Sequence, residues 1–193
     1  MKKTEKISAG SFDLNKWLYG GYEKDIITMI AGPPGSGKSN FCFLVSCSQA
    51  KKGNKVIFID TEGGFSSERV KQIVGDEHYA EVLKNILILN PVNFKEQKEI
   101  FSNLLKTVNK QHASLIVVDG MAMLYRLELG EALQNGQGKR NKNDDQVKTV
   151  NREVAKQMRI LAEISRKQEI PIIITNQVYA GFLSEDELRK GTE

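Results

Sequence analysis

One glycine-rich stretch constrains the fold of this chain more than any other part of the sequence. Residues 30–40 read I-A-G-P-P-G-S-G-K-S-N, so three closely spaced glycines lead into Lys38 and Ser39. Glycines allow a tight turn whose backbone N–H groups face inward, and the helix that follows points its positive dipole end at the same place. The spacing G-x-x-x-x-G-K-S predicts a P-loop, in which the lysine reaches the β- and γ-phosphates and the serine hydroxyl binds Mg²⁺. The residues predicted to surround the phosphates are Gly32, Pro33, Pro34, Gly35, Ser36, Gly37, Lys38, Ser39 and Asn40.

Short apolar runs alternate with helical patterns along the chain, which predicts an α/β fold with a mainly parallel sheet. Five runs have the length and composition of buried strands: Asp25–Ala31, Lys55–Asp60, Asn85–Leu89, Ser114–Asp119 and Pro171–Thr175. Besides the helix that starts at the P-loop, the spacing of apolar residues predicts helices at Ser67–Val74, Phe94–Lys110 and Asp145–Lys167. Gly130–Asp144 is rich in glycine and asparagine, so we expect a mobile loop there.

The composition is that of one soluble globular domain. The chain has 193 residues, of which 40% are hydrophobic, and no apolar run approaches the roughly 18 residues that a membrane span needs. No apolar segment follows the basic N-terminus, which argues against a secretory signal and predicts a cytoplasmic protein. Cys42 and Cys47 lie on different faces of one predicted helix, so we expect buried thiols and no disulfide. A metal site built from these cysteines with His78 and His112 is not favoured.

Polar side chains follow four of the five predicted strands, at the carboxyl ends where a parallel sheet places its active site. Asp119 ends the fourth strand and can hold Mg²⁺ through water, completing the coordination that Ser39 begins. Glu62 follows the second strand and could activate the attacking water as a general base; alternatively, it only caps the next turn. Gln177 follows the fifth strand, where its amide could bind a γ-phosphate and report its loss; alternatively, T-N-Q is only a turn.

A basic segment follows Asp119 and makes nucleic acid a candidate partner. Lysine and arginine displace the counterions condensed on DNA, and glycine-rich basic loops suit a phosphate backbone. A solvent-exposed helix face explains the helical part of the segment equally well. The net charge of the chain is +4, and the basic residues of this segment are Lys139, Arg140, Lys142, Lys148, Arg152, Lys156 and Arg159.

Four motifs together resemble the RecA-type recombinase family. They read G-P-P-G-S-G-K-S, F-I-D-T-E-G-G-F-S-S-E-R-V, I-V-V-D-G-M-A-M-L-Y-R and I-I-I-T-N-Q-V, and the resemblance covers essentially the whole chain. The chain is most similar to the archaeal recombinases. No helix-hairpin-helix domain precedes the core, which makes the chain similar to the RadB family of archaeal recombinase paralogues.

This resemblance implies roles for individual residues. Glu62 matches the family's catalytic glutamate, Gln177 its γ-phosphate sensor and Arg69 the arginine that stacks on adenine, while Lys38 joins the first two in catalysis. ATP and Mg²⁺ are the implied cofactors. With the predicted strands numbered along the chain, the implied sheet order is 3-2-4-5-1. The family's two DNA loops match residues 126–144 and 180–193, and the predicted DNA contacts are Arg126, Lys139, Arg140 and Lys142.

The sequence departs from the family pattern in three places. Gly120 stands where related recombinases usually have a serine near the metal, which predicts slow ATP hydrolysis. No phenylalanine-containing polymerisation arm precedes the core, so we expect no long filaments, although smaller oligomers remain open. The chain stops inside the second DNA loop, before the strands that flank the P-loop strand in the family. We therefore expect residues 1–193 to be one RecA-like ATPase core that lacks its C-terminal strands.

These observations predict an ATP-binding and DNA-binding accessory protein of homologous recombination and DNA repair, with weak or slow ATP hydrolysis. Its expected partners are DNA, single-stranded by preference, and the main recombinase of the same cell. Two alternatives stay open: an efficient DNA-dependent ATPase recombinase, and a KaiC-type RecA-fold regulator that binds proteins and not DNA.

Overall fold

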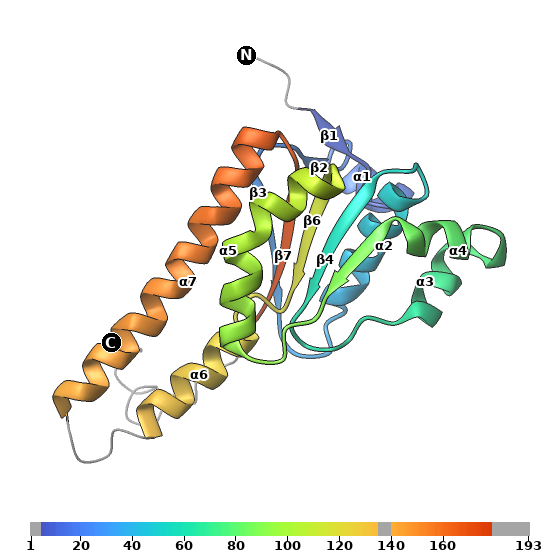
Figure 1. Cartoon of the computed structure of the whole chain (residues 1–193). Helices are drawn as coiled ribbons and strands as arrows, with labels where there is room; N and C mark the ends of the chain where they lie inside the picture. The colour runs from blue at the N-terminus through green and yellow to red at the C-terminus, as the bar shows by residue number, and fades with distance from the viewer. Residues whose placement is uncertain (1–4, 135–139, 179–193) are drawn as a thin grey trace, which may run out of the picture.

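A parallel sheet of five strands in the order β3-β7-β6-β4-β5 forms the centre of the computed structural model (Figure 1). The structure describes residues 5–134 and 140–178, and the side chains of residues 134 and 140–144 lie outside that description. The strands are β3 (Ile27–Gly32), β4 (Lys55–Asp60), β5 (Ile86–Leu89), β6 (Ala113–Asp119) and β7 (Ile172–Gln177). Each strand is parallel to its neighbours, so the expected RecA-like α/β class and strand order are confirmed.

Strands β4 and β6 lie next to each other inside the sheet because both of their faces are apolar. Every side chain from Val56 to Ile59 and from Leu115 to Val118 is buried, as expected of parallel strands covered by helices on both faces. The register pairs Asp60 with Asp119, and the last residue of β3 with the last residue of β7. The carboxyl ends of these four strands therefore lie at the same end of the sheet.

Helices cover both faces of the sheet, as Figure 1 shows. One face carries α2 (Lys38–Ala50), α3 (Ser67–Val74) and α4 (Asp76–Lys84), and the other carries α5 (Phe94–Gln111) and α7 (Arg140–Gln168). Successive strand residues point to opposite faces, so Phe58 packs in the cluster that contains α2 and Ile59 in the cluster that contains α5 and α7. The short helix α4 was not expected from the sequence.

A small antiparallel sheet precedes the main one in the chain. Strand β1 (Lys6–Ile7) pairs with β2 (Tyr22–Glu23), and helix α1 (Phe12–Trp17) lies between them in sequence. Ile7 and Tyr22 are buried in the same apolar cluster as the residues of α2, so this N-terminal element rests on the core. In the described ranges, no helix combines the length and the apolar character that crossing a membrane requires.

The expected mobile loop at Gly130–Asp144 is wrong at both of its ends. Helix α6 (Met123–Gln134) extends into it and α7 begins already at Arg140, while the residues between the two helices lie outside the described part of the chain. One glycine costs a helix only about 1 kcal/mol, and the neighbouring leucine, glutamate and alanine residues are strong helix formers. The two helices also pack together, because Leu124 and Val150 are buried in one apolar cluster.

Candidate nucleotide-binding site

The P-loop connects the end of β3 to α2, and a hydrogen bond between two of its own residues spans it. Lys38 is 8% exposed, and its Nζ donates to the carbonyl oxygen of Pro33 across the loop at 2.8 Å. Gly37 precedes the first turn of α2 in the left-handed conformation (φ 84°), and no described side chain caps this helix. A Cβ atom on Gly32 would lie 2.7 Å from Ser36 Oγ, so a larger residue there would have to displace the Ser36 hydroxyl. An uncapped helix N-terminus beside an inward-folded lysine suits an anion, and these residues therefore fit a chain of phosphates.

The carboxylate of Asp119 is held in one orientation by the neighbouring strand. Thr175 Oγ1 donates to Asp119 Oδ1 at 2.6 Å and accepts from the backbone N–H of Gly120 at 2.7 Å. Thr175 is fully buried and Asp119 is 3% exposed. Ser39, the other predicted magnesium ligand, is the second residue of α2. Within the described ranges no group of three His, Cys, Asp or Glu side chains could hold a metal, so Mg²⁺ here would take further ligands from phosphate oxygens and water.

Asp60 shapes the turn that carries Glu62, a role that the sequence analysis missed. Its Oδ1 accepts from the backbone N–H groups of Glu62 and Gly64, both at 3.2 Å, and its Oδ2 accepts from that of Phe65 at 2.7 Å. The Phe65 ring packs edge-on against Phe58, with 5.1 Å between the ring centroids. An aspartate that directly precedes a glycine-rich turn commonly accepts hydrogen bonds from the turn backbone, and this signal could have identified Asp60.

Gly120 allows the turn after β4 to lie against the end of β6. Its φ is +87°, and a Cβ atom there would lie 2.5 Å from Thr61 Oγ1 and 2.7 Å from Glu62 Cγ. The Thr61 hydroxyl lies within donating distance of the carbonyl oxygens of Gly120 (2.7 Å) and Asp119 (3.0 Å). A serine does not fit this arrangement, so the glycine does more than remove a hydroxyl: it lets Glu62 come next to Asp119's strand.

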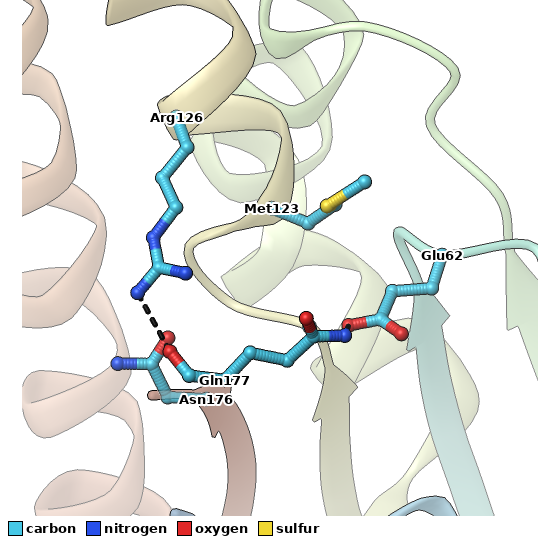
Figure 2. A pocket seen from close by; sticks show the side chains of 6 residues that line it. Glu62, Met123, Arg126, Asn176 and Gln177 are labelled. Carbon is cyan, nitrogen blue, oxygen red and sulfur yellow. Dashed lines mark hydrogen bonds between the residues drawn. The ribbon is translucent and has the colours of Figure 1, made fainter. Parts of the chain in front are cut away.

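Glu62 and Gln177 meet in a small pocket at the ends of their strands, together with Arg126 of α6 (Figure 2). Gln177 Nε2 donates to Glu62 Oε1 at 2.9 Å, which joins the end of β7 to the end of β4 across β6. Arg126 Nη2 donates to the backbone carbonyl oxygen of Gln177 at 2.6 Å. The structure therefore brings two of the predicted catalytic residues into contact. The remaining lining residues are Gly120, Met123 and Asn176.

Arg69 lies at the start of α3, beside the first turn of α2. Its Nε donates to Asn40 Oδ1 at 3.1 Å and its Nη1 donates to Gln72 Oε1 at 2.9 Å. The helix itself is capped by Ser66, whose hydroxyl oxygen accepts from the backbone N–H of Arg69 at 3.2 Å. The predicted adenine-stacking residue is therefore hydrogen-bonded to α2, the helix that begins at the P-loop.

The two cysteines of α2 are free and buried, as the sequence predicts. Burial raises the pKa of the Cys42 thiol well above its ordinary value, and the charge of Asp119 raises it further. Burial also raises the pKa of Cys47 to about 11. Both thiols are therefore protonated near neutral pH and supply no nucleophile to the site.

Comparison with known proteins identifies the family of this fold and site. The family model described as Rad51 matches residues 1–188. The chain belongs to the Rad51 family. Two similar proteins are both described as "DNA repair and recombination protein RadB". The one from Methanobrevibacter smithii is 37% identical over 171 residues, which cover 88% of this chain and 66% of the relative. The one from Methanocaldococcus jannaschii is 42% identical over 165 residues, which cover 86% of this chain and 71% of the relative.

These findings confirm that the chain is a RadB-like member of the RecA/RadA superfamily. The chain spans about two thirds of the length of these two relatives. Membership of the Rad51 family does not test the predicted DNA contacts individually. Arg126 is half-buried with its guanidinium turned into the pocket of Figure 2. Lys139 and the side chains of Arg140 and Lys142 lie outside the described part of the structure, so these contacts stay predictions.

Proposed function

We propose that this Rad51-family chain binds ATP with Mg²⁺ at its P-loop and acts as a DNA-binding accessory protein in homologous recombination and DNA repair. The observation that carries the proposal is the hydrogen bond between Gln177 and Glu62, on the two strands that flank β6. This contact places a residue suited to sense a phosphate against a residue suited to activate water, beside the P-loop. The names of the two relatives, which refer to DNA repair and recombination, support the biological role.

The residues of the P-loop and of the neighbouring strand ends would bind different parts of ATP with Mg²⁺. Lys38 would exchange the Pro33 carbonyl oxygen for the oxygens of the β- and γ-phosphates. Ser39 would supply an oxygen ligand to Mg²⁺ and Asp119 would hold the ion through water, and the charge of the ion offsets that of the phosphates. Thr175 keeps the Asp119 carboxylate in a fixed orientation through its 2.6 Å hydrogen bond, so this ligand needs little reordering when the site fills.

Two features favour slow hydrolysis. Glu62 Oε1 accepts a hydrogen bond from Gln177, so this oxygen must leave the amide before it can take a proton from water. Gly120 supplies no hydroxyl beside the metal, and its conformation leaves no room for a serine. We therefore expect a turnover below about 1 s⁻¹, the lower end of the usual range for enzymes.

Arg126 provides a physical link between the nucleotide site and the segment matched to the first DNA loop. We expect the end of β7 to shift when Gln177 turns its amide from Glu62 toward a phosphate oxygen. Arg126 holds the Gln177 carbonyl oxygen at 2.6 Å and belongs to α6, which leads into residues 135–139. A shift of the strand end therefore reaches α6. ATP can favour DNA binding in this way only if it binds one arrangement of these elements better than the other.

Two measurements test the proposal against its alternatives. We expect ATP turnover to stay slow with or without a single-stranded oligonucleotide; fast, DNA-stimulated turnover would instead identify an efficient ATPase recombinase. We also expect the chain to bind that oligonucleotide with an affinity that falls as salt rises, as measured by fluorescence anisotropy. No binding at low salt would favour a KaiC-type regulator.

Charge-neutralising variants locate the DNA contact. Replacing Lys139, Arg140 and Lys142 with glutamine should lower the affinity for DNA, whereas Glu62→Gln should leave it unchanged. The matched control replaces three exposed lysines of α5, a helix that precedes this segment in the sequence. These lysines are Lys95, Lys106 and Lys110. Equal losses of affinity in the two triple variants would show that the chain binds DNA only through its overall charge.

A further inference from the structure

Two neutral side chains hold the guanidinium of Arg69 from two sides. Its Nε donates to Asn40 Oδ1 on α2 at 3.1 Å, and its Nη1 donates to Gln72 Oε1 on α3 at 2.9 Å. We propose that Asn40 and Gln72 are positioning residues that orient Arg69 as a stacking platform for the base of the bound nucleotide. The inference rests on the proposed ATP site.

The two hydrogen bonds fix the plane of the guanidinium as well as its position. All N–H bonds of an arginine side chain lie in one plane, so acceptors on two different nitrogens define the orientation of that plane. One acceptor belongs to the P-loop helix and the other to the helix of Arg69 itself, so the plane is fixed relative to the P-loop. An exposed arginine without such partners samples many rotamers, and restraining it beforehand lowers the entropy cost of binding a ligand.

The same contacts favour a base platform over a phosphate ligand. Arginine binds phosphates through pairs of N–H groups in its plane. In Arg69 two of the five N–H groups, on different nitrogens, already serve Asn40 and Gln72, which leaves fewer in-plane pairs for a phosphate, whereas the two faces of the guanidinium donate no hydrogen bonds. Those faces stack on planar aromatic systems. The geometry therefore points to a base, and a purine offers a large planar face.

The location and chemistry of the two acceptors agree with this role. Asn40 lies two residues after Lys38 in the first turn of α2, so the guanidinium lies close to the place where the phosphates would bind. Asn40, Arg69 and Gln72 are all exposed, so a base can reach the platform. Both acceptors are uncharged amides. A carboxylate at position 40 would orient the arginine equally well but would place a negative charge beside the phosphates.

Isothermal titration of ATP and of inorganic tripolyphosphate, each with Mg²⁺, separates the two parts of the site. Because tripolyphosphate has no base, its affinity should be the same in Gln72→Ala and in the unsubstituted chain. The affinity for ATP should fall about threefold to tenfold in each alanine variant, the effect of losing one hydrogen bond. Gln72→Glu keeps an acceptor and should keep the affinity for ATP. Glu68→Ala, an exposed change on the same helix, is the matched control and should bind both ligands normally.

Each other outcome has a distinct meaning. Equal loss of ATP and tripolyphosphate binding in Gln72→Ala would overturn the positioning role, because this residue would then act on the P-loop. Unchanged ATP affinity in both variants would overturn it as well, while leaving the ATP site itself intact. If the unsubstituted chain binds neither ligand, the proposed function fails and the inference fails with it. Thermal melting of each variant identifies any loss that comes from unfolding.

Discussion

Thr175→Val tests the hydroxyl that joins β7 to the end of β6. Valine keeps the shape of threonine, but Asp119 Oδ1 loses a donor at 2.6 Å and the Gly120 N–H loses an acceptor at 2.7 Å. A hydrogen bond to a charged group contributes about 1.5–3 kcal/mol, and a buried donor left without a partner costs about 1–3 kcal/mol. Because these groups are buried, we expect the free energy of unfolding to fall by about 3–5 kcal/mol. That is a large share of the roughly 5–15 kcal/mol that stabilises a domain.

Urea unfolding followed by circular dichroism measures this loss. Thr175→Ser is the matched control because it keeps the hydroxyl and removes one methyl group, which should cost about 1 kcal/mol. We also expect the valine variant to bind Mg²⁺ with ATP more weakly than the serine variant, since Asp119 is then free to turn. If the free energies of unfolding of the valine and serine variants differ by less than about 1 kcal/mol, the hydroxyl does not hold Asp119 as described.

Four further predictions follow from contacts in and around the site. Gly120→Ala introduces a Cβ atom 2.5 Å from a threonine oxygen at a φ of +87°, so urea unfolding should show a loss of about 2–4 kcal/mol; a loss below about 1 kcal/mol would mean that the turn adapts freely. Asp60→Asn keeps one acceptor oxygen but turns an N–H₂ group toward a backbone donor, so the free energy of unfolding should fall by about 1–3 kcal/mol and ATP turnover should slow. An unchanged midpoint of urea unfolding would argue against the role of Asp60 in the turn. At pH 8, Cys42 and Cys47 of the folded chain should react with a thiol reagent far more slowly than free cysteine does, because a pKa of about 11 leaves only about one thousandth of Cys47 as thiolate. Rapid labelling of the folded protein would contradict this expectation. Arg126→Gln should reduce the gain in DNA affinity that ATP produces while ATP binding stays unchanged; an equal loss of DNA affinity with and without ATP would indicate a direct DNA contact.

The sheet could be predicted because its strands are read from short local patterns. Strands β4 and β6 are continuous apolar runs that end in aspartate, and the P-loop spacing identifies the strand and helix on either side of it. The order of the strands came from the resemblance to the RecA-type family, and the structure confirms it. The helices were less predictable. Gly130 and its polar neighbours suggested a loop, but α6 extends to Gln134 and α7 begins at Arg140, and packing between the two helices stabilises both.

The contacts within the candidate site could not be read from the sequence because they depend on register. Thr175 reaches Asp119 only because β7 lies directly beside β6, more than fifty residues away in the chain. The left-handed conformation of Gly120 and the inward turn of Arg126 likewise result from the turns around them. Motif spacing and sheet order together place Glu62 and the end of β7 at one edge of the sheet, and the structure shows the hydrogen bond between Glu62 and Gln177 there.

The most direct test of the account is the effect of ATP on DNA affinity in the unsubstituted chain and in Gln177→Ala. This variant removes the amide that contacts Glu62 at 2.9 Å, and Asn176→Ala, in the same pocket, is its control. We predict that ATP with Mg²⁺ raises the affinity for a single-stranded oligonucleotide about fivefold or more in the unsubstituted chain and in the control. In Gln177→Ala the gain should vanish although ATP still binds. A DNA affinity that does not respond to ATP in the unsubstituted chain, or a full response in Gln177→Ala, would show that ATP does not control DNA binding through Gln177.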